Sequence, residues 1–135
     1  MNEYGYVKVG ASTVELKVAN TIYNVEMIKK QIDKNIQIIS FPELSITGYT
    51  CGDLFNQDVL IDASYEGIKD LVNYSKDKMI VIIVGAPIKC ENKLYNCAVV
   101  INDGKVLVGG KCKCDSTNGY VDDGNGNCIL DAINP

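Results

Sequence analysis

The chain has 135 residues, 47% of them hydrophobic, so it is long enough to bury the core of one domain. Its 13 basic and 17 acidic side chains give a net charge of -4, which disfavours nucleic-acid binding because phosphate recognition needs a basic surface. No apolar run reaches the roughly 18 residues of a membrane span. The chain has no histidine, which excludes sites that use imidazole as a base or as a zinc ligand.

The first half of the chain alternates between predicted strands and helices. Residues 4–11 contain strand-forming types and predict a first strand. A helix follows, with Asn20 or Thr21 as its candidate N-cap. Residues 36–41 predict a second strand, which Pro42 ends. The apolar residues that recur at helical spacing in the helix are Ile22, Val25, Ile28 and Ile32.

The second half predicts one helix and three strands. Residues 57–75 have the pattern of an amphipathic helix, weakened by Gly67. Residues 79–84 are six consecutive apolar residues, typical of a strand covered on both faces. Residues 94–101 and 105–108 flank Asn102-Asp103-Gly104, a sequence typical of a tight hairpin turn. The order β-α-β-α-β-β-β predicts an α/β fold with parallel crossovers and a final antiparallel hairpin, in a mixed sheet with two helices.

The composition changes near residue 109, and residues 109–135 form an irregular tail rich in cysteine, glycine and asparagine. We interpret it as a turn-rich, disordered extension or as foreign sequence. An alternative is the C-terminal half of an EGF-like repeat, because Cys112, Cys114 and Cys128 lie near Gly119-Tyr120. Three cysteines without histidine do not complete a zinc site, and residues 122–127 lack the spacing of a calcium loop, so we predict no metal site.

The N-terminus has neither a basic region nor the apolar stretch of a secretory signal. We therefore predict a cytoplasmic protein with reduced thiols. Cys51 and Cys97 are interpreted as small buried residues, and Cys90 as an exposed residue of a loop.

The densest candidate site follows the second predicted strand, in residues 41–55. Glu43 comes just after the strand, at the end where open α/β sheets place their sites, and Pro42 stiffens the turn that presents it. A carboxylate beside an apolar surface is suited to act as a general base. The alternative is a solvated glutamate in a loop.

The segment Phe41-Pro42-Glu43-Leu44 followed by Thr47-Gly48-Tyr49 resembles the first catalytic block of the nitrilase, or carbon–nitrogen hydrolase, superfamily. Residues 48–55, with Lys8-Val9 and residues 94–100, are similar to the N-terminal glutaminase domain of bacterial glutamine-dependent NAD synthetases. The resemblance covers residues 1 to 108.

The resemblance implies an α-β-β-α sandwich and a Cys-Glu-Lys triad that hydrolyses the amide of glutamine, with Glu43 as the catalytic base. Tyr49 and Asp53 are candidate residues of the substrate pocket. The resemblance also implies that ammonia passes to a separate synthetase domain, which binds ATP and deamido-NAD. We thus expect no cofactor within this chain.

Two catalytic residues of the implied triad have no clear match. Lys111 and Lys113 lie near the place of the lysine, but neither follows a proline as the resemblance requires, and a solvated lysine is the alternative. The nucleophilic cysteine is expected beyond residue 135. We therefore expect a domain truncated after about residue 108 and inactive by itself.

The second half of the implied sandwich is also missing, so one face of the strand at residues 79–84 is expected to be uncovered. Uncovering its three large side chains costs on the order of 5–9 kcal/mol. The missing part of the domain, or self-association, would have to cover this face. Two other functions stay open, a non-catalytic α/β interaction module with an EGF-like tail and another amidase of the superfamily.

Overall fold

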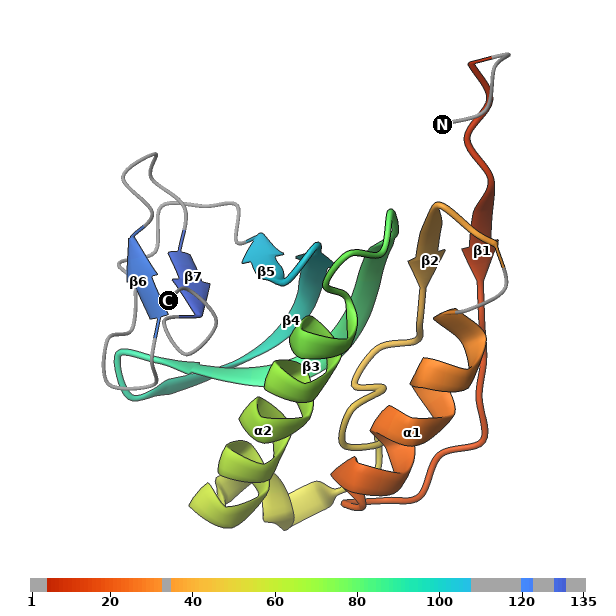
Figure 1. The fold of residues 1–135 in the computed structure, drawn as a ribbon. Coiled ribbons are helices and arrows are strands. Elements are labelled where there is room, and N and C mark those ends of the chain that lie inside the picture. Colours follow the sequence, from red (N-terminus) through yellow and green to blue (C-terminus); the bar gives the residue numbers. More distant parts are fainter. Residues whose placement is uncertain (1–4, 33–34, 108–119, 123–127, 131–135) are drawn as a thin grey trace.

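The computed structural model describes residues 5–32 and 35–107, and the backbone of residues 120–122 and 128–130. Five strands form one sheet in the order β1-β2-β3-β4-β5 (Figure 1). They are β1 (Val9–Ala11), β2 (Ile38–Ser40), β3 (Val81–Cys90), β4 (Lys93–Asn102) and β5 (Lys105–Leu107). The helices are α1 (Thr21–Ile32) and α2 (Asp58–Tyr74), with a short 3-10 helix, η1 (Gly52–Asn56), before α2.

The strand directions follow from the connections. β1, β2 and β3 are parallel, and α1 and α2 form the two crossovers between them. β3, β4 and β5 are antiparallel, and Asp103 and Gly104 turn the chain between the last two strands with φ values of 43° and 75°. The predicted α/β fold and the tight hairpin turn are therefore confirmed.

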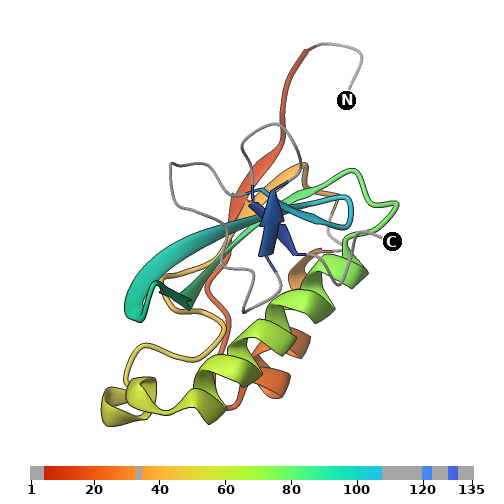
Figure 2. The same cartoon turned by 90° about the vertical axis from the view of Figure 1, so that its left-hand side faces the viewer.

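Both helices pack on one face of the sheet, which we call the helix face (Figure 2). The apolar stripe of α2 lies on side chains that alternate along the strands, so one continuous core forms. Its members include Ile28 from α1, Ile68 from α2 and Ile82 from β3, each fully buried.

Helix α1 begins as the sequence predicts, but its buried stripe is shifted. The Asn20 side-chain oxygen accepts a hydrogen bond from the Tyr23 backbone N–H at 3.1 Å, so Asn20 is the N-cap. Ile22 shares the helical spacing of Val25, Ile28 and Ile32, but it is 80% exposed while these three are buried. Thr21 and Asn24 are buried instead, because the Asn24 amide donates hydrogen bonds to the Lys17 and Ile46 carbonyl oxygens and thereby ties α1 to two loops.

Strand β3 begins later and ends much later than the predicted range 79–84. Met79 is 85% exposed and precedes the strand. The strand continues through Pro87 to Cys90 because β4 pairs with it along all ten residues. Cys90 therefore ends a strand and is half-buried, which corrects its assignment to an exposed loop.

Proline is tolerated in this long strand because of where its nitrogen points. The Gly85 N–H and the Lys89 N–H bond to Ser45 and Tyr65, both outside β4. Pro87 has the same alternation, so its ring nitrogen also points away from β4 and no ladder hydrogen bond is lost.

The face of the sheet opposite the helices is apolar and incompletely covered, and we call it the open face. Val9 is 67% exposed, Pro87 is buried, and the other side chains are exposed or half-buried. This agrees with the expectation that one sheet face is uncovered. By strand alternation its apolar members are Val9, Ala11, Ile38, Val81, Ile83, Pro87, Leu94, Ala98, Val100 and Leu107.

Several predicted boundaries differ from the structure. β1 and β2 have three residues each, shorter than the predicted ranges 4–11 and 36–41, because their pairing extends over only three positions. The predicted helix at 57–75 is confirmed within one residue at each end. The tail is not wholly irregular, since β6 (Tyr120–Asp122) and β7 (Cys128–Leu130) pair antiparallel. Among the described residues, no helix has the length and apolarity of a membrane span.

Candidate active site

The turn that carries Glu43 continues from the carboxyl end of β2 and folds back over β3. The Phe41 N–H still donates to the Ile83 carbonyl oxygen at 2.9 Å, as a sheet residue would. The chain turns just after this residue. Leu44 has a φ of 52°, a left-handed conformation that is uncommon for a branched side chain. Backbone strain of this kind is concentrated at functional sites.

This turn packs against Gly85 of β3. Its N–H donates to the Ser45 hydroxyl oxygen at 3.1 Å, and its carbonyl oxygen accepts from the Ile46 N–H at 3.1 Å. A Cβ at position 85 would lie 2.2 Å from the Leu44 nitrogen, so only glycine allows the turn to come this close. Alternation along β3 directs this missing side chain to the open face.

The Glu43 carboxylate accepts a hydrogen bond from the side-chain amide of Asn96 in β4. Asn96 is opposite Pro87 in the sheet register, so it projects from the same open face as the turn. Glu43 is exposed, and the apolar surrounding expected for it is not formed by the described residues. The structure thus holds the carboxylate at the strand end predicted from sequence, on the uncovered side of the sheet.

The two other predicted site residues do not contact Glu43 in the hydrogen bonds and ion pairs of the described chain. Tyr49 is 67% exposed. Asp53 is exposed in the first turn of η1. Neither residue lines a described pocket, and their assignment to a substrate pocket stays a prediction. Sequence reasoning missed Asn96 and Gly85, because no local pattern indicates that they lie beside residue 43.

None of the cysteines with described side chains lies beside Glu43 on the open face. Cys51 is buried, as predicted, and its thiol donates to the Thr47 carbonyl oxygen at 3.2 Å. Cys97 is half-buried, not buried as predicted, and it pairs with Ala86 on the helix face. By strand alternation, the Cys90 side chain lies on this helix face as well. The candidates Lys111 and Lys113 lie outside the described residues.

Three described lysines, Lys29, Lys69 and Lys89, form ion pairs with carboxylates other than Glu43. The hydrogen bond to Asp58, at 2.7 Å, raises the pKa of Lys89. Burial lowers the pKa of Lys29, but hydrogen bonds to Asp70 and Glu26 outweigh it and leave this pKa raised. Within the described part of the chain, no ion pair joins a lysine to Glu43.

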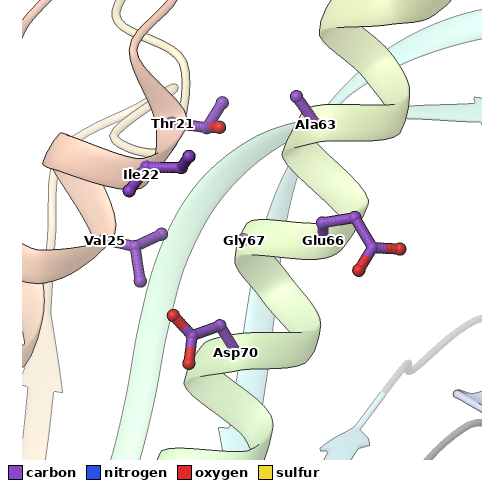
Figure 3. Close-up of a pocket in the computed structure, with 7 residues that line it drawn as sticks. All are labelled: Thr21, Ile22, Val25, Ala63, Glu66, Gly67 and Asp70. Carbon is purple, nitrogen blue, oxygen red and sulfur yellow. The ribbon is translucent and has the colours of Figure 1, made fainter.

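A groove of about 390 Å³ lies between α1 and α2, on the other side of the sheet from Glu43 (Figure 3). The Asp70 carboxylate points toward α1, where Lys29 pairs with it, and the Glu66 carboxylate points away from the groove. No cysteine lines this groove. Its lining residues are Thr21, Ile22, Val25, Ala63, Glu66, Gly67 and Asp70. The described residues also contain no cluster of acidic and cysteine side chains that could bind a metal ion.

Solved structures show which class of protein has this fold. A glutamine-dependent NAD(+) synthetase from Cytophaga hutchinsonii matches with a TM-score of 0.69 and 28% identity over 74% of this chain and 18% of its own. An amidase from Nesterenkonia sp. AN1 matches with a TM-score of 0.63 over 80% of this chain and 43% of its own, and its 14% identity supports the fold alone. The fold is therefore that of the nitrilase-type enzymes.

The family follows from the sequence comparison. The model of the carbon–nitrogen hydrolase family matches residues 10–119, and the chain belongs to this family. The glutamine-dependent NAD(+) synthetase of Mycobacterium tuberculosis is 37% identical over 109 residues, and that of Aquifex aeolicus is 34% identical over 87. These matches cover 78% and 62% of this chain but only 16% and 15% of the relatives. The chain therefore spans about a sixth of the length of these relatives.

Proposed function

We propose that this chain is the part of a glutaminase that supplies the general base, and that the ammonia released from glutamine serves NAD biosynthesis. The observation that carries the proposal is the position of Glu43. Glu43 follows β2 in the sequence and lies on the open face of the sheet. Gly85 packs against the backbone of its turn, and Asn96 donates a hydrogen bond to its carboxylate. The homology to glutamine-dependent NAD(+) synthetases supports glutamine as the substrate.

The proposed chemistry needs a carboxylate that can accept a proton. Glu43 takes the proton of a cysteine thiol, and the thiolate attacks the amide carbon of glutamine. The same carboxyl group then returns the proton to the departing amine, so ammonia leaves and a thioester remains. Water activated by Glu43 hydrolyses the thioester to glutamate.

The nucleophile has to reach Glu43 from the open face. The described cysteines do not lie there, so the thiol and the oxyanion-stabilising lysine are assigned to residues outside the described ranges. The covering layer, either the rest of a domain or a second chain, would complete the site. ATP and deamido-NAD would bind a separate synthetase domain. The cytoplasm is the proposed compartment, because a nucleophilic thiol must be kept reduced.

The first test uses the purified chain with L-glutamine and an enzymatic assay for ammonia. We expect no detectable ammonia release, because no cysteine with a described side chain lies beside Glu43. Clear turnover that Glu43→Gln abolishes would show that this chain completes the site by itself.

The second test asks whether Glu43 works when a covering layer is present. Residues 1–108 replace the matching segment of the M. tuberculosis relative, which is 37% identical. We expect the hybrid to hydrolyse glutamine and Glu43→Gln to abolish this activity. Glu91→Gln makes the same change at an exposed glutamate of the β3–β4 turn and should have no effect.

The hybrid has an internal control for folding, since NAD synthesis from added ammonium does not need the glutaminase site. A Glu43→Gln hybrid that still releases ammonia from glutamine would contradict the proposed role of Glu43.

A further inference from the structure

The Asn96 side chain contacts the Glu43 carboxylate from a strand 53 residues away in sequence. We propose that Asn96 is a positioning residue, which holds the Glu43 carboxylate in one orientation for proton transfer. The inference rests on the proposed function, in which Glu43 is the base. Asn96 belongs to residues 94–100, which share in the family resemblance, and the inference gives this residue a role that the resemblance did not assign.

The backbone that carries Asn96 is held rigidly. β4 pairs with β3 along ten residues, and Asn96 lies opposite the buried Pro87 near the middle of this ladder. Proline fixes its own φ angle, which further limits movement of the pair. Asn96 is therefore mounted on a long two-stranded ribbon and not on a loop.

The same ribbon also carries the surface under the Glu43 turn. Gly85, which contacts the backbone of the turn, is two residues from Pro87, a separation of about 7 Å along a strand. One pair of strands thus fixes both the main chain of the turn and the side chain of Glu43. This arrangement restricts the carboxylate at both ends, which is the requirement for a positioned general base.

The chemical type of residue 96 suits this role. A side-chain amide donates a hydrogen bond but carries no charge, so it orients the carboxylate without opposing protonation as strongly as a lysine would. The hydrogen bond goes to one carboxylate oxygen, Oε1. In the described chain, the second oxygen, Oε2, has no hydrogen bond or ion pair and is available to receive the thiol proton.

Nuclear magnetic resonance of the purified, isotope-labelled chain tests the contact without requiring activity. The Asn96 side-chain NH2 resonances should shift when the solution is acidified enough to protonate carboxylates. Glu43→Gln should remove this pH dependence. Resonances that do not respond to pH, or that respond equally in Glu43→Gln, would overturn the proposal.

The hybrid enzyme described above tests the consequence for catalysis. Asn96→Ala should lower kcat for glutamine about 10- to 100-fold, the effect of losing a charge-assisted hydrogen bond, with KM changed less than about twofold. Asn96→Gln, which keeps the amide, should recover part of kcat. The matched control is Asn102→Ala, because Asn102 lies on the same strand but donates to the Ile80 carbonyl oxygen.

The outcomes separate this inference from the proposed function. If Glu43→Gln abolishes the glutaminase activity while Asn96→Ala keeps full kcat, the positioning role is wrong and Glu43 remains the base. If Glu43→Gln keeps the activity, the proposed function itself fails. An equal loss in Asn96→Ala and Asn102→Ala would show a general effect on β4, which also overturns the positioning role.

Discussion

Gly85→Ala tests whether the packing of the Glu43 turn on β3 determines the stability of the domain. The added Cβ would lie 2.2 Å from the Leu44 nitrogen and 2.8 Å from both the Glu43 carbonyl carbon and the Pro42 oxygen. These are backbone atoms, and ordinary contact begins near 3.4 Å, so the turn would have to retreat by more than 1 Å.

The cost of this retreat follows from the contacts it breaks. Two hydrogen bonds of 3.1 Å join Gly85 to Ser45 and Ile46, and their loss costs about 1 kcal/mol each. Overpacking adds about 1–3 kcal/mol, and the smaller entropy of the unfolded alanine chain returns about 0.4–1 kcal/mol. We therefore expect the free energy of unfolding to fall by about 2–5 kcal/mol.

Urea unfolding followed by circular dichroism measures this change, since the chain has no tryptophan for fluorescence. The matched control is Gly67→Ala in α2, where the added Cβ would lie 3.1 Å from a Val25 methyl group and 3.3 Å from an Ile46 methyl group. These side chains can shift, and alanine favours the helix by about 1 kcal/mol, so this variant should stay close to the wild type. If Gly85→Ala is as stable as Gly67→Ala, the reasoning about the turn is refuted.

Three further predictions concern the core and the ionised side chains. The Ser64 hydroxyl is buried and has no hydrogen-bond partner within the described chain, so Ser64→Ala should raise the free energy of unfolding by about 1 kcal/mol; a loss of stability in urea unfolding would contradict this. Burial lowers the pKa of Lys29, but the contacts with Asp70 and Glu26 raise it by a larger amount, so the pKa in the folded state lies above the ordinary 10.5. The stability from this contact is complete below pH 10.5 and is lost as pH rises through the folded pKa, so Lys29→Met should lose less stability than the wild type in alkaline unfolding experiments. Cys51 is buried, so peptide mass spectrometry after brief alkylation of the native chain should show it labelled more slowly than the half-buried cysteines of β3 and β4, and equal labelling would contradict its burial.

Part of the candidate site could be predicted from the residues around Glu43. A strand that ends in proline places the next residue at the carboxyl end of the sheet. The amino-acid sequence of residues 41–55 resembles that of the family to which the chain belongs. The contacts of Glu43 could not be predicted. Asn96 lies in residues 94–100, which share in the family resemblance, but nothing near it in the sequence indicates a contact with Glu43, and the two residues meet only because β4 pairs with β3 in one register.

Features that depend on neighbouring residues could be predicted from the amino-acid sequence alone. The order of helices and strands, the Asn20 cap and the turn at Asp103-Gly104 follow from spacing and turn chemistry, which act within a few residues. The lack of histidine limited the chemistry before any fold was known.

The contacts between residues far apart in the sequence became known from the fold. The ladder between β3 and β4 carried a strand through Pro87, and the packing of α1 left Ile22 exposed while it buried Asn24. The same packing brought the backbone of residues 42–44 onto Gly85. These outcomes depend on strand register and on the volume available between layers, and neither quantity is contained in the local pattern of a single sequence.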